Sequence, residues 1–277
     1  MRSRIIVDSC CDMTPEMKDR MNVVAVPLTM TVDGVEYRDD ERLDLRDFMD
    51  KLKRFMGKAG SASPSPFLYQ KAIEDSDNAY VVTLSGKLSG SHSNAVLGND
   101  AASENGKGAA CVFDSKSASA GETLIAIKIH DLIKSGMPQD GIIDTVHRFI
   151  DGMKTYFVLE NYDNLRKNGR LSRVAGTLAH ILDIKLIMGS DGNGEIALFD
   201  KCRGINKMTR RMINLIADSG KETENENIVI SHCNNHGLAD QLTSFIKERF
   251  HFKTVYVVPM GGLSSLYADD KGVILAF

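Results

Sequence analysis

Three serine-rich loops carry the side chains best suited to binding chemistry in this 277-residue chain. They are residues 61–66 (SASPSP), 88–91 (LSGS) and 114–117 (DSKS). Serine hydroxyls and free backbone N–H groups at the start of a helix can bind an anion. Serine is also common at helix caps and in turns, so the spacing alone favours serines with only this structural role.

Ser89 could instead be a nucleophile, but the hydrolase motif G-x-S-x-G is absent, because residues 86–90 read GKLSG. No particular histidine suggests itself as the base for Ser89. Residues 232–236 (HCNNH) lack the glutamate of the zinc motif H-E-x-x-H, and we expect them in a solvated strand-to-helix loop. The sequence therefore predicts no catalytic residue and no metal ligand.

A group of basic side chains gives the second half of the chain a local positive character. Its members are Arg166, Lys167, Arg170, Lys201, Arg203 and Lys207. They could form a solvated face, or they could form a docking surface for an anionic group or a phosphate-handling partner.

Strands and helices alternate in the first half of the chain. The expected strands are residues 4–8, 22–27, 79–84 and 109–113, and the expected helices start near Pro15, Asp44, Pro66, Ser91 and Gly121. Residues 30–40 form a hairpin that turns at Asp33-Gly34. The alternation predicts a Rossmann-like parallel sheet with helices on both faces, which binds ligands at the carboxyl ends of its strands. The loops at 85–90 and 114–115 fall at that edge.

The second half has more hairpins and fewer helices. Residues 183–204 form a hairpin, and helices are expected over 174–182, 206–218 and 238–250. This pattern predicts a mixed or antiparallel sheet with helices. We place a domain boundary near Lys154, which gives a parallel α/β domain over 1–154 and a mixed-sheet domain over 155–277.

The composition argues against a nucleic-acid-binding protein, a membrane-spanning protein and a disulfide-stabilised protein. A net charge of −3 gives no basic footprint for nucleic acid. No segment approaches the ~18 apolar residues of a membrane helix, and Asp8 interrupts the apolar run near the N-terminus. The five cysteines are odd in number and form no C-x-x-C motif, which favours free thiols in a reducing cytoplasm.

Taken in order, these segments resemble the motifs of the DegV family of bacterial fatty-acid-binding proteins. The matching segments are residues 5–9 with Asp12, 26–39, 61–66, 84–91 (LSGKLSGS), 114–121, 165–172 (LRKNGRLS) and 201–204 (KCRG). Three positions depart from the family pattern. Ser61 replaces a threonine but keeps the hydroxyl, Leu186 replaces a proline, and Tyr267 takes the place of a histidine near the C-terminus.

The resemblance implies two α/β domains with a long-chain fatty acid in a tunnel beside the cleft between them. The carboxylate would meet the hydroxyls of Ser61 and Ser89, with a backbone N–H of Gly90 or Ser91 as a further donor. Arg170, Arg203 and Tyr267 would lie at the rim, with the guanidinium groups of both arginines unpaired. Such a chain is a carrier that needs no cofactor, and it presents the acid to a separate fatty acid kinase that makes an acyl phosphate.

Two alternatives stay open at this point. One is an enzyme acting on a lipid or a small carboxylate, as a phosphotransferase or as an esterase working through Ser89. The other is a binding module for a different carboxylated ligand.

Overall fold

The computed structural model describes residues 3–107, 110–172, 174 and 184–277. The parallel sheet expected in the first half is present. Its strands are β1 (Ser3–Asp8), β2 (Val23–Val26), β6 (Asn78–Thr83) and β7 (Cys111–Asp114), in the order β2-β1-β6-β7. Every pair in this sheet is parallel, so the loops that follow the strands meet at one edge.

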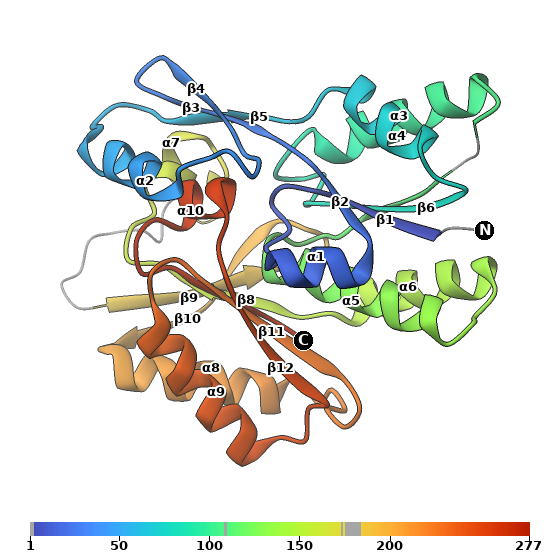
Figure 1. Cartoon of the computed structure of the whole chain (residues 1–277). Helices are drawn as coiled ribbons and strands as arrows, with labels where there is room; N and C mark the ends of the chain where they lie inside the picture. Colours follow the sequence, from blue (N-terminus) through green and yellow to red (C-terminus); the bar gives the residue numbers. More distant parts are fainter. Residues whose placement is uncertain (1–2, 108–109, 173, 175–183) are drawn as a thin grey trace.

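Helices cover both faces of the parallel sheet, as Figure 1 shows. Side chains alternate along each strand. Ile6 and Val81 therefore pack under α3 (Pro66–Glu74) and α4 (Ser91–Glu104). Val7 and Val82 face α1 (Pro15–Met21), α5 (Ala120–Lys134) and α6 (Gln139–Gly152). The strands are apolar at successive positions because both faces of the sheet are buried.

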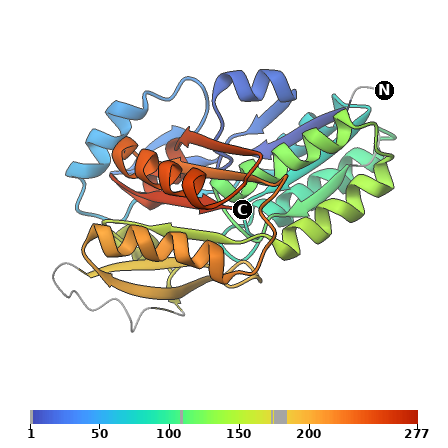
Figure 2. The same ribbon diagram turned by 90° about the horizontal axis from the view of Figure 1, so that it is seen from below.

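The second half forms a six-stranded sheet in the order β10-β9-β8-β13-β11-β12. The strands are β8 (Thr155–Val158), β9 (Ile184–Ser190), β10 (Ile196–Arg203), β11 (Asn227–His232), β12 (Thr254–Pro259) and β13 (Val273–Ala276). Only the β11–β12 pair is parallel, so the mixed sheet predicted from the sequence is confirmed. Helices α8 (Ile205–Asp218) and α9 (His236–Arg249) cover its outer face, and Figure 2 shows them from below.

Helix α5 packs against strands of both large sheets, β1 and β6 on one side and β11 and β13 on the other. Its residues are buried almost throughout its first three turns, and one core cluster joins Leu124 and Ile125 to Val229 and Ala276. All strands of the parallel sheet precede Lys154 and all strands of the mixed sheet follow it. The division into two domains at Lys154 stays a prediction, and the two sheets share this core.

The third sheet is small and has three strands. It joins the hairpin β3 (Thr29–Val32) and β4 (Val35–Arg38) to β5 (Gly60–Ala62). Asp33 and Gly34 both have positive φ, so the predicted turn is confirmed. Helices α2 (Leu45–Arg54), α7 (Asp163–Lys167) and α10 (Gly262–Ala268) pack in the same region.

The sequence analysis missed β5, α6, α7 and α10. Residues 60–62 were expected in a loop, yet they pair with Thr29, Met30 and Thr31 of β3. Helix α6 carries the spacing Ile142, Val146, Ile150 on its buried face, a pattern that indicates a helix. The helix predicted over 174–182 lies, apart from Val174, outside the described residues. Within the described residues, no helix is long and apolar enough to span a bilayer.

Close packing of α3 on α4 gives a prediction about stability. A Cβ at Gly98 would lie 2.5 Å from the Pro66 carbonyl oxygen and 2.7 Å from Tyr69 Cβ. We expect Gly98→Ala to lower the free energy of unfolding by about 1–3 kcal/mol, because the backbone itself must move. Gly152→Ala is the matched control, since a Cβ there meets nothing within 4 Å. Urea denaturation checks both, and equal stability of the two variants would contradict the packing described.

Candidate functional site

A cavity of about 110 Å³ lies between the carboxyl edge of the parallel sheet and the inner face of the mixed sheet. Most of its lining is apolar and comes from both halves of the chain, for example Leu88, Phe157 and Leu263. Four polar side chains of the lining lie together, because Arg170 contacts both Tyr267 and the loop of Ser89, and Tyr267 bonds to Ser61; we call this part the polar end. The structure therefore brings together four of the seven residues expected to form the site and its rim.

Ser61 and Tyr267 form a hydrogen-bonded pair at this polar end. Pairing of β5 with β3 fixes Ser61, and Tyr267 comes from the last turn of α10. The Ser61 Oγ and Tyr267 Oη atoms lie 2.8 Å apart. One of these hydroxyls donates to the other, so the pair retains one O–H that can donate to a ligand.

Ser89 is linked to the start of α4. Its Oγ accepts a hydrogen bond of 3.2 Å from the Ser91 N–H, the first residue of that 14-residue helix. A hydroxyl that accepts from a helix N-terminus is polarised by the positive end of the helix dipole. Because the oxygen accepts, the Ser89 O–H proton remains available to an anion in the cavity.

Gly90 and Ser91 themselves do not line the cavity. The Ser91 N–H points to Ser89, and the buried Ser91 hydroxyl donates to Asp8 Oδ2 at 2.6 Å. Tyr69 Oη lies 2.5 Å from the same hydroxyl. Ser91 therefore donates to Ser89 and does not line the cavity. The sequence analysis expected its N–H to donate directly to the ligand carboxylate.

Arg170 is not the unpaired guanidinium that the sequence analysis expected. Its Nε donates to the Leu88 carbonyl oxygen at 3.1 Å, and Nη1 donates to the Asn168 carbonyl oxygen at 2.5 Å. The guanidinium carbon lies 6.0 Å from the centre of the Tyr267 ring, within reach of a cation–π contact. Arg170 thus ties the loop that carries Ser89 to the helix that carries Tyr267.

Arg203 lies apart from these residues. It is exposed at the end of β10, paired in register with Ile184, and it does not line the cavity. The cavity meets this hairpin at its other end, at Gly194, Glu195 and Ile196. A role for Arg203 with a partner stays a prediction.

Two buried aspartates hold α10 over the cavity. Asp39 accepts from the Gly262 and Leu263 N–H groups, both at 3.0 Å, at the start of this helix. Asp12 Oδ1 accepts from the Gly261 N–H at 2.7 Å, and its Oδ2 accepts from the Ser119 hydroxyl. Burial raises the pKa of both carboxyls, that of Asp12 to about 7.

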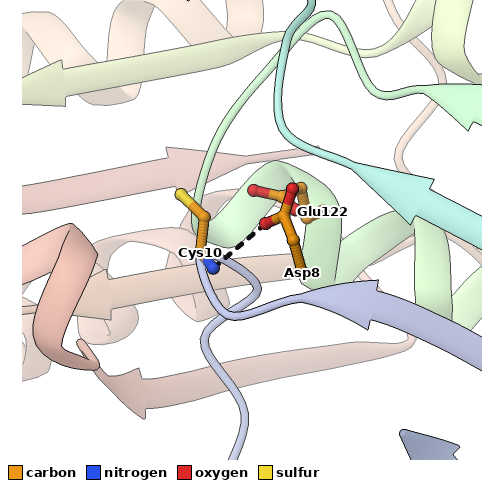
Figure 3. Close-up of side chains that lie close together, drawn as sticks. All are labelled: Asp8, Cys10 and Glu122. Atoms are coloured by element: carbon orange, nitrogen blue, oxygen red, sulfur yellow. Dashed lines mark hydrogen bonds between the residues drawn. The ribbon is translucent and has the colours of Figure 1, made fainter. Parts of the chain in front are cut away.

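A third buried aspartate, Asp8, holds the loop after β6. It accepts from the Leu84 N–H at 2.9 Å and the Cys10 N–H at 3.1 Å. Figure 3 shows Asp8, Cys10 and Glu122 close together. Their potential ligand atoms all lie within 4.8 Å of one another. Burial, followed by the Asp8 charge, raises the pKa of Glu122 well above its ordinary range, so a protonated Glu122 can donate to Asp8. We interpret this group as a hydrogen-bonded structural cluster and not as a cation site.

The solvated loop expected over 232–236 is shorter than predicted: His232 is the buried last residue of β11, and His236 is the first residue of α9. The buried His232 accepts through Nδ1 from the Asn235 N–H at 3.3 Å, and its ring centre is 4.3 Å from that of His236. Burial lowers the pKa of His232. The His232 ring therefore has a hydrogen-bond partner within the protein.

Comparison with known proteins identifies the family. Residues 2–275 match the DegV family, which is described as a family of uncharacterised proteins. This chain belongs to the DegV family. A DegV domain-containing protein of Streptococcus pneumoniae strain R6 is 32% identical over 280 residues, which cover 100% of this chain and 99% of that protein.

Solved structures of DegV proteins share the fold. A DegV protein from Ruminococcus gnavus, refined with vaccenic acid, has a TM-score of 0.94 and 38% identity, covering 99% of each chain. The fatty acid kinase B3 protein of S. pneumoniae, loaded with linoleic acid, has a TM-score of 0.91 and 32% identity, covering 100% of this chain and 99% of that one. A DegV protein from Eubacterium eligens, loaded with heptadecanoic acid, has a TM-score of 0.92 and 30% identity over 99% of each chain.

The raised pKa of Asp12 predicts a specific pH dependence of stability. Burial raises this pKa from 3.8 to about 7, so between those values the folded protein binds a proton that the unfolded chain releases. The contribution of Asp12 to stability is therefore full below about pH 4 and is lost as the pH rises to about 7. Asp12→Asn mimics the protonated form, and we expect it to flatten this part of the pH profile.

Urea midpoints measured across this pH range check the prediction. Asp100→Asn, at an exposed acid on α4, is the matched control and should keep the wild-type slope. A slope for Asp12→Asn that equals the wild-type slope would show that Asp12 titrates normally in the folded protein.

Proposed function

We propose that this chain binds a long-chain fatty acid in the cavity, with the carboxylate at the end formed by Ser61 and Ser89. The observation that carries the proposal is an apolar cavity whose polar end holds hydroxyl donors and no free cation in its described lining. Related DegV proteins solved with vaccenic, heptadecanoic and linoleic acids support the same ligand class.

The donors suit a carboxylate that must remain available for reaction. An arginine that donates two hydrogen bonds to a carboxylate would bind it strongly. Here the Arg170 guanidinium already donates to two carbonyl oxygens, so it contributes positive potential without a bidentate bond to the carboxylate. The hydroxyls of the Ser61–Tyr267 pair and of Ser89 supply weaker bonds, which another protein could compete for.

Affinity would come mainly from the acyl chain. Burial of methylenes is worth ~0.8 kcal/mol each, so fourteen of them give an upper bound of roughly 11 kcal/mol before ordering costs. The leucine and phenylalanine side chains of the lining offer the surface for this burial.

A carrier role fits the surroundings of Ser89 better than catalysis does. Among the described residues, the hydrogen-bond partner of its hydroxyl is the Ser91 N–H, which cannot act as a general base. The similarity to the S. pneumoniae fatty acid kinase B3 protein supports a separate kinase as partner. This chain would present the carboxylate, and the kinase would convert it to an acyl phosphate. Five free cysteines support a cytoplasmic location.

The head-group prediction is tested with Ser61→Ala, Ser89→Ala and the double variant. Each lost hydroxyl should cost about 1.5–3 kcal/mol of binding, because it donates to a charged group, while the buried tail keeps some affinity. Ser103→Ala, an exposed hydroxyl on α4, should bind like wild type. Fluorescence competition against a labelled fatty acid measures the four affinities. Wild-type affinity in the double variant would place the carboxylate elsewhere.

The partner prediction concerns Arg203, which is exposed near other basic side chains of β10 and α8. Arg203→Ala should slow phosphorylation of bound oleate by the partner kinase several-fold and leave oleate affinity unchanged. Lys247→Ala removes an exposed cation from α9 and should have no effect. The pure protein with ATP and oleate should form no acyl phosphate. Product formation without the kinase would establish an enzyme, and an unchanged rate with Arg203→Ala would remove this residue from the docking surface.

A further inference from the structure

One short segment of the chain bonds to all three parts of the backbone that carry the hydroxyls of the polar end. This segment, residues 164–170, comprises most of α7 and the turn after it, and its Leu165 lines the cavity. The side chains of Asn164, Asn168 and Arg170 each donate to a backbone carbonyl oxygen of a distant part of the chain. Each accepting carbonyl lies one or two residues from a hydroxyl of the polar end.

Asn164 fixes the end of α10. Its Nδ2 donates to the Leu266 carbonyl oxygen at 2.8 Å. That carbonyl belongs to the last turn of a helix that ends at Ala268, where carbonyl groups lack a partner within the helix. Tyr267 is the next residue, so the bond holds the backbone from which the tyrosine side chain extends.

Asn168 fixes the start of β5. Its Nδ2 donates to the Ala59 and Asn164 carbonyl oxygens, both at 2.8 Å. Strand β5 has three residues and lies at the edge of the small sheet, whose strand order is β4-β3-β5. The bond to the buried Ala59 therefore adds a second support to a short edge strand, and that strand carries Ser61.

Arg170 makes the third bond of this kind. Its Nε donates to the Leu88 carbonyl oxygen, and Ser89 is the next residue. Its Nη1 donates to the Asn168 carbonyl oxygen, so the arginine is connected to both asparagines. Because the partners of both asparagine side chains are carbonyl oxygens, each asparagine must direct its NH₂ group, and not its amide oxygen, toward its partner.

We propose that Asn164 and Asn168 are positioning residues for the carboxylate of the bound acid. Asn164 acts through the Tyr267 hydroxyl. Asn168 acts through the Ser61 hydroxyl. The proposal rests on the function proposed above, because it requires the carboxylate at the polar end. Neither asparagine lines the cavity, so both act on the ligand through other residues. A hydrogen bond weakens steeply when its donor is misdirected, so holding the two backbone segments keeps the hydroxyls directed at one point.

Two ligands with the same tail distinguish positioning from support of the fold. Oleate has a charged head group, and oleyl alcohol has a neutral one. We expect Asn168→Ala to weaken oleate binding by about tenfold, because misdirecting the Ser61 hydroxyl removes a hydrogen bond to a charged group. Oleyl alcohol should lose less than about threefold, because its bond is weaker. Asn168→Asp keeps the size of the side chain but replaces the donor with an acceptor, so it should act like Asn168→Ala. Calorimetric titration of the delipidated proteins measures both affinities.

A double-mutant cycle tests whether Asn168 acts through Ser61. In a Ser61→Ala background, Asn168→Ala should change oleate affinity by less than about twofold, because the hydroxyl that it positions is gone. Asn164→Ala is tested in the same way against Tyr267→Phe, which gives an independent pair should the Asn168 variants fold poorly. Equal losses with and without the hydroxyl would overturn the proposal.

Asn235→Ala is the matched control. The Asn235 side chain also donates to a distant carbonyl oxygen, that of Lys271 at 2.7 Å, and neither residue lines the cavity. This variant should lower the stability to urea and leave the ratio of oleate affinity to oleyl alcohol affinity at its wild-type value.

The outcomes separate this proposal from the carrier function. If wild type binds oleate and the Asn164 and Asn168 variants keep the wild-type ratio of the two affinities, these asparagines only support the fold and the carrier function stands. If Asn235→Ala lowers the ratio as much as they do, loss of stability explains the effect and the proposal is wrong. If wild type does not bind oleate, the proposed function fails and the positioning role fails with it.

Discussion

The positions of the site loops depend on three buried carboxylates that accept hydrogen bonds from backbone N–H groups. Asp8 holds the loop that leads to Ser89, whereas Asp12 and Asp39 hold the start of α10, which carries Tyr267. Burial makes the charged form of each carboxyl costly and raises its pKa, and the hydrogen bonds from backbone N–H groups offset part of that cost. Each carboxylate therefore fixes one loop geometry, because any other would leave it unsatisfied.

These carboxylates also explain why the cavity belongs to both halves of the chain. Asp12 follows the first strand of the parallel sheet, yet it bonds to Gly261, only 12 residues before β13 begins in the mixed sheet. Helix α5 packs between the same two sheets and shares a core with both. Hydrogen bonds between side chains also cross this junction, at Ser61–Tyr267 and at Ser117–Thr155. A complete binding cavity therefore requires the two halves to be packed together.

The sequence predicted the large sheets well because their strands carry local signals. Continuous apolar runs, the Asp33-Gly34 turn and the prolines that begin helices at Pro15 and Pro66 lie within a few residues of what they determine. Ser61 and Ser89 were predicted as site residues through a resemblance to the DegV family, since their spacing alone does not distinguish a site from a turn. Helix α10 was missed because residues 261–268 (GGLSSLYA) are mostly small and show no clear helical pattern. The helix is stabilised at its start by hydrogen bonds from the Gly262 and Leu263 N–H groups to the distant Asp39.

Contacts between distant segments lay beyond what sequence patterns could predict. Ser61 and Tyr267 are 206 residues apart, and Arg170 bonds to a carbonyl oxygen 82 residues away. Nothing near Arg170 in the sequence indicates that its guanidinium is occupied, so an unpaired group was expected. Ser91 was expected to face the ligand for the same reason, because its bond to Asp8 joins residues that only the folded sheet brings together.

A crystal structure of the chain with a fatty acid brominated at its terminal carbon tests the central claim most directly, since anomalous scattering locates one end of the ligand independently. The account predicts carboxylate oxygens ~2.5–3.0 Å from the Ser61 or Ser89 hydroxyl and the bromine inside the apolar part of the cavity, away from both hydroxyls. A ligand bound in the reverse direction, or one outside this cavity, would contradict it.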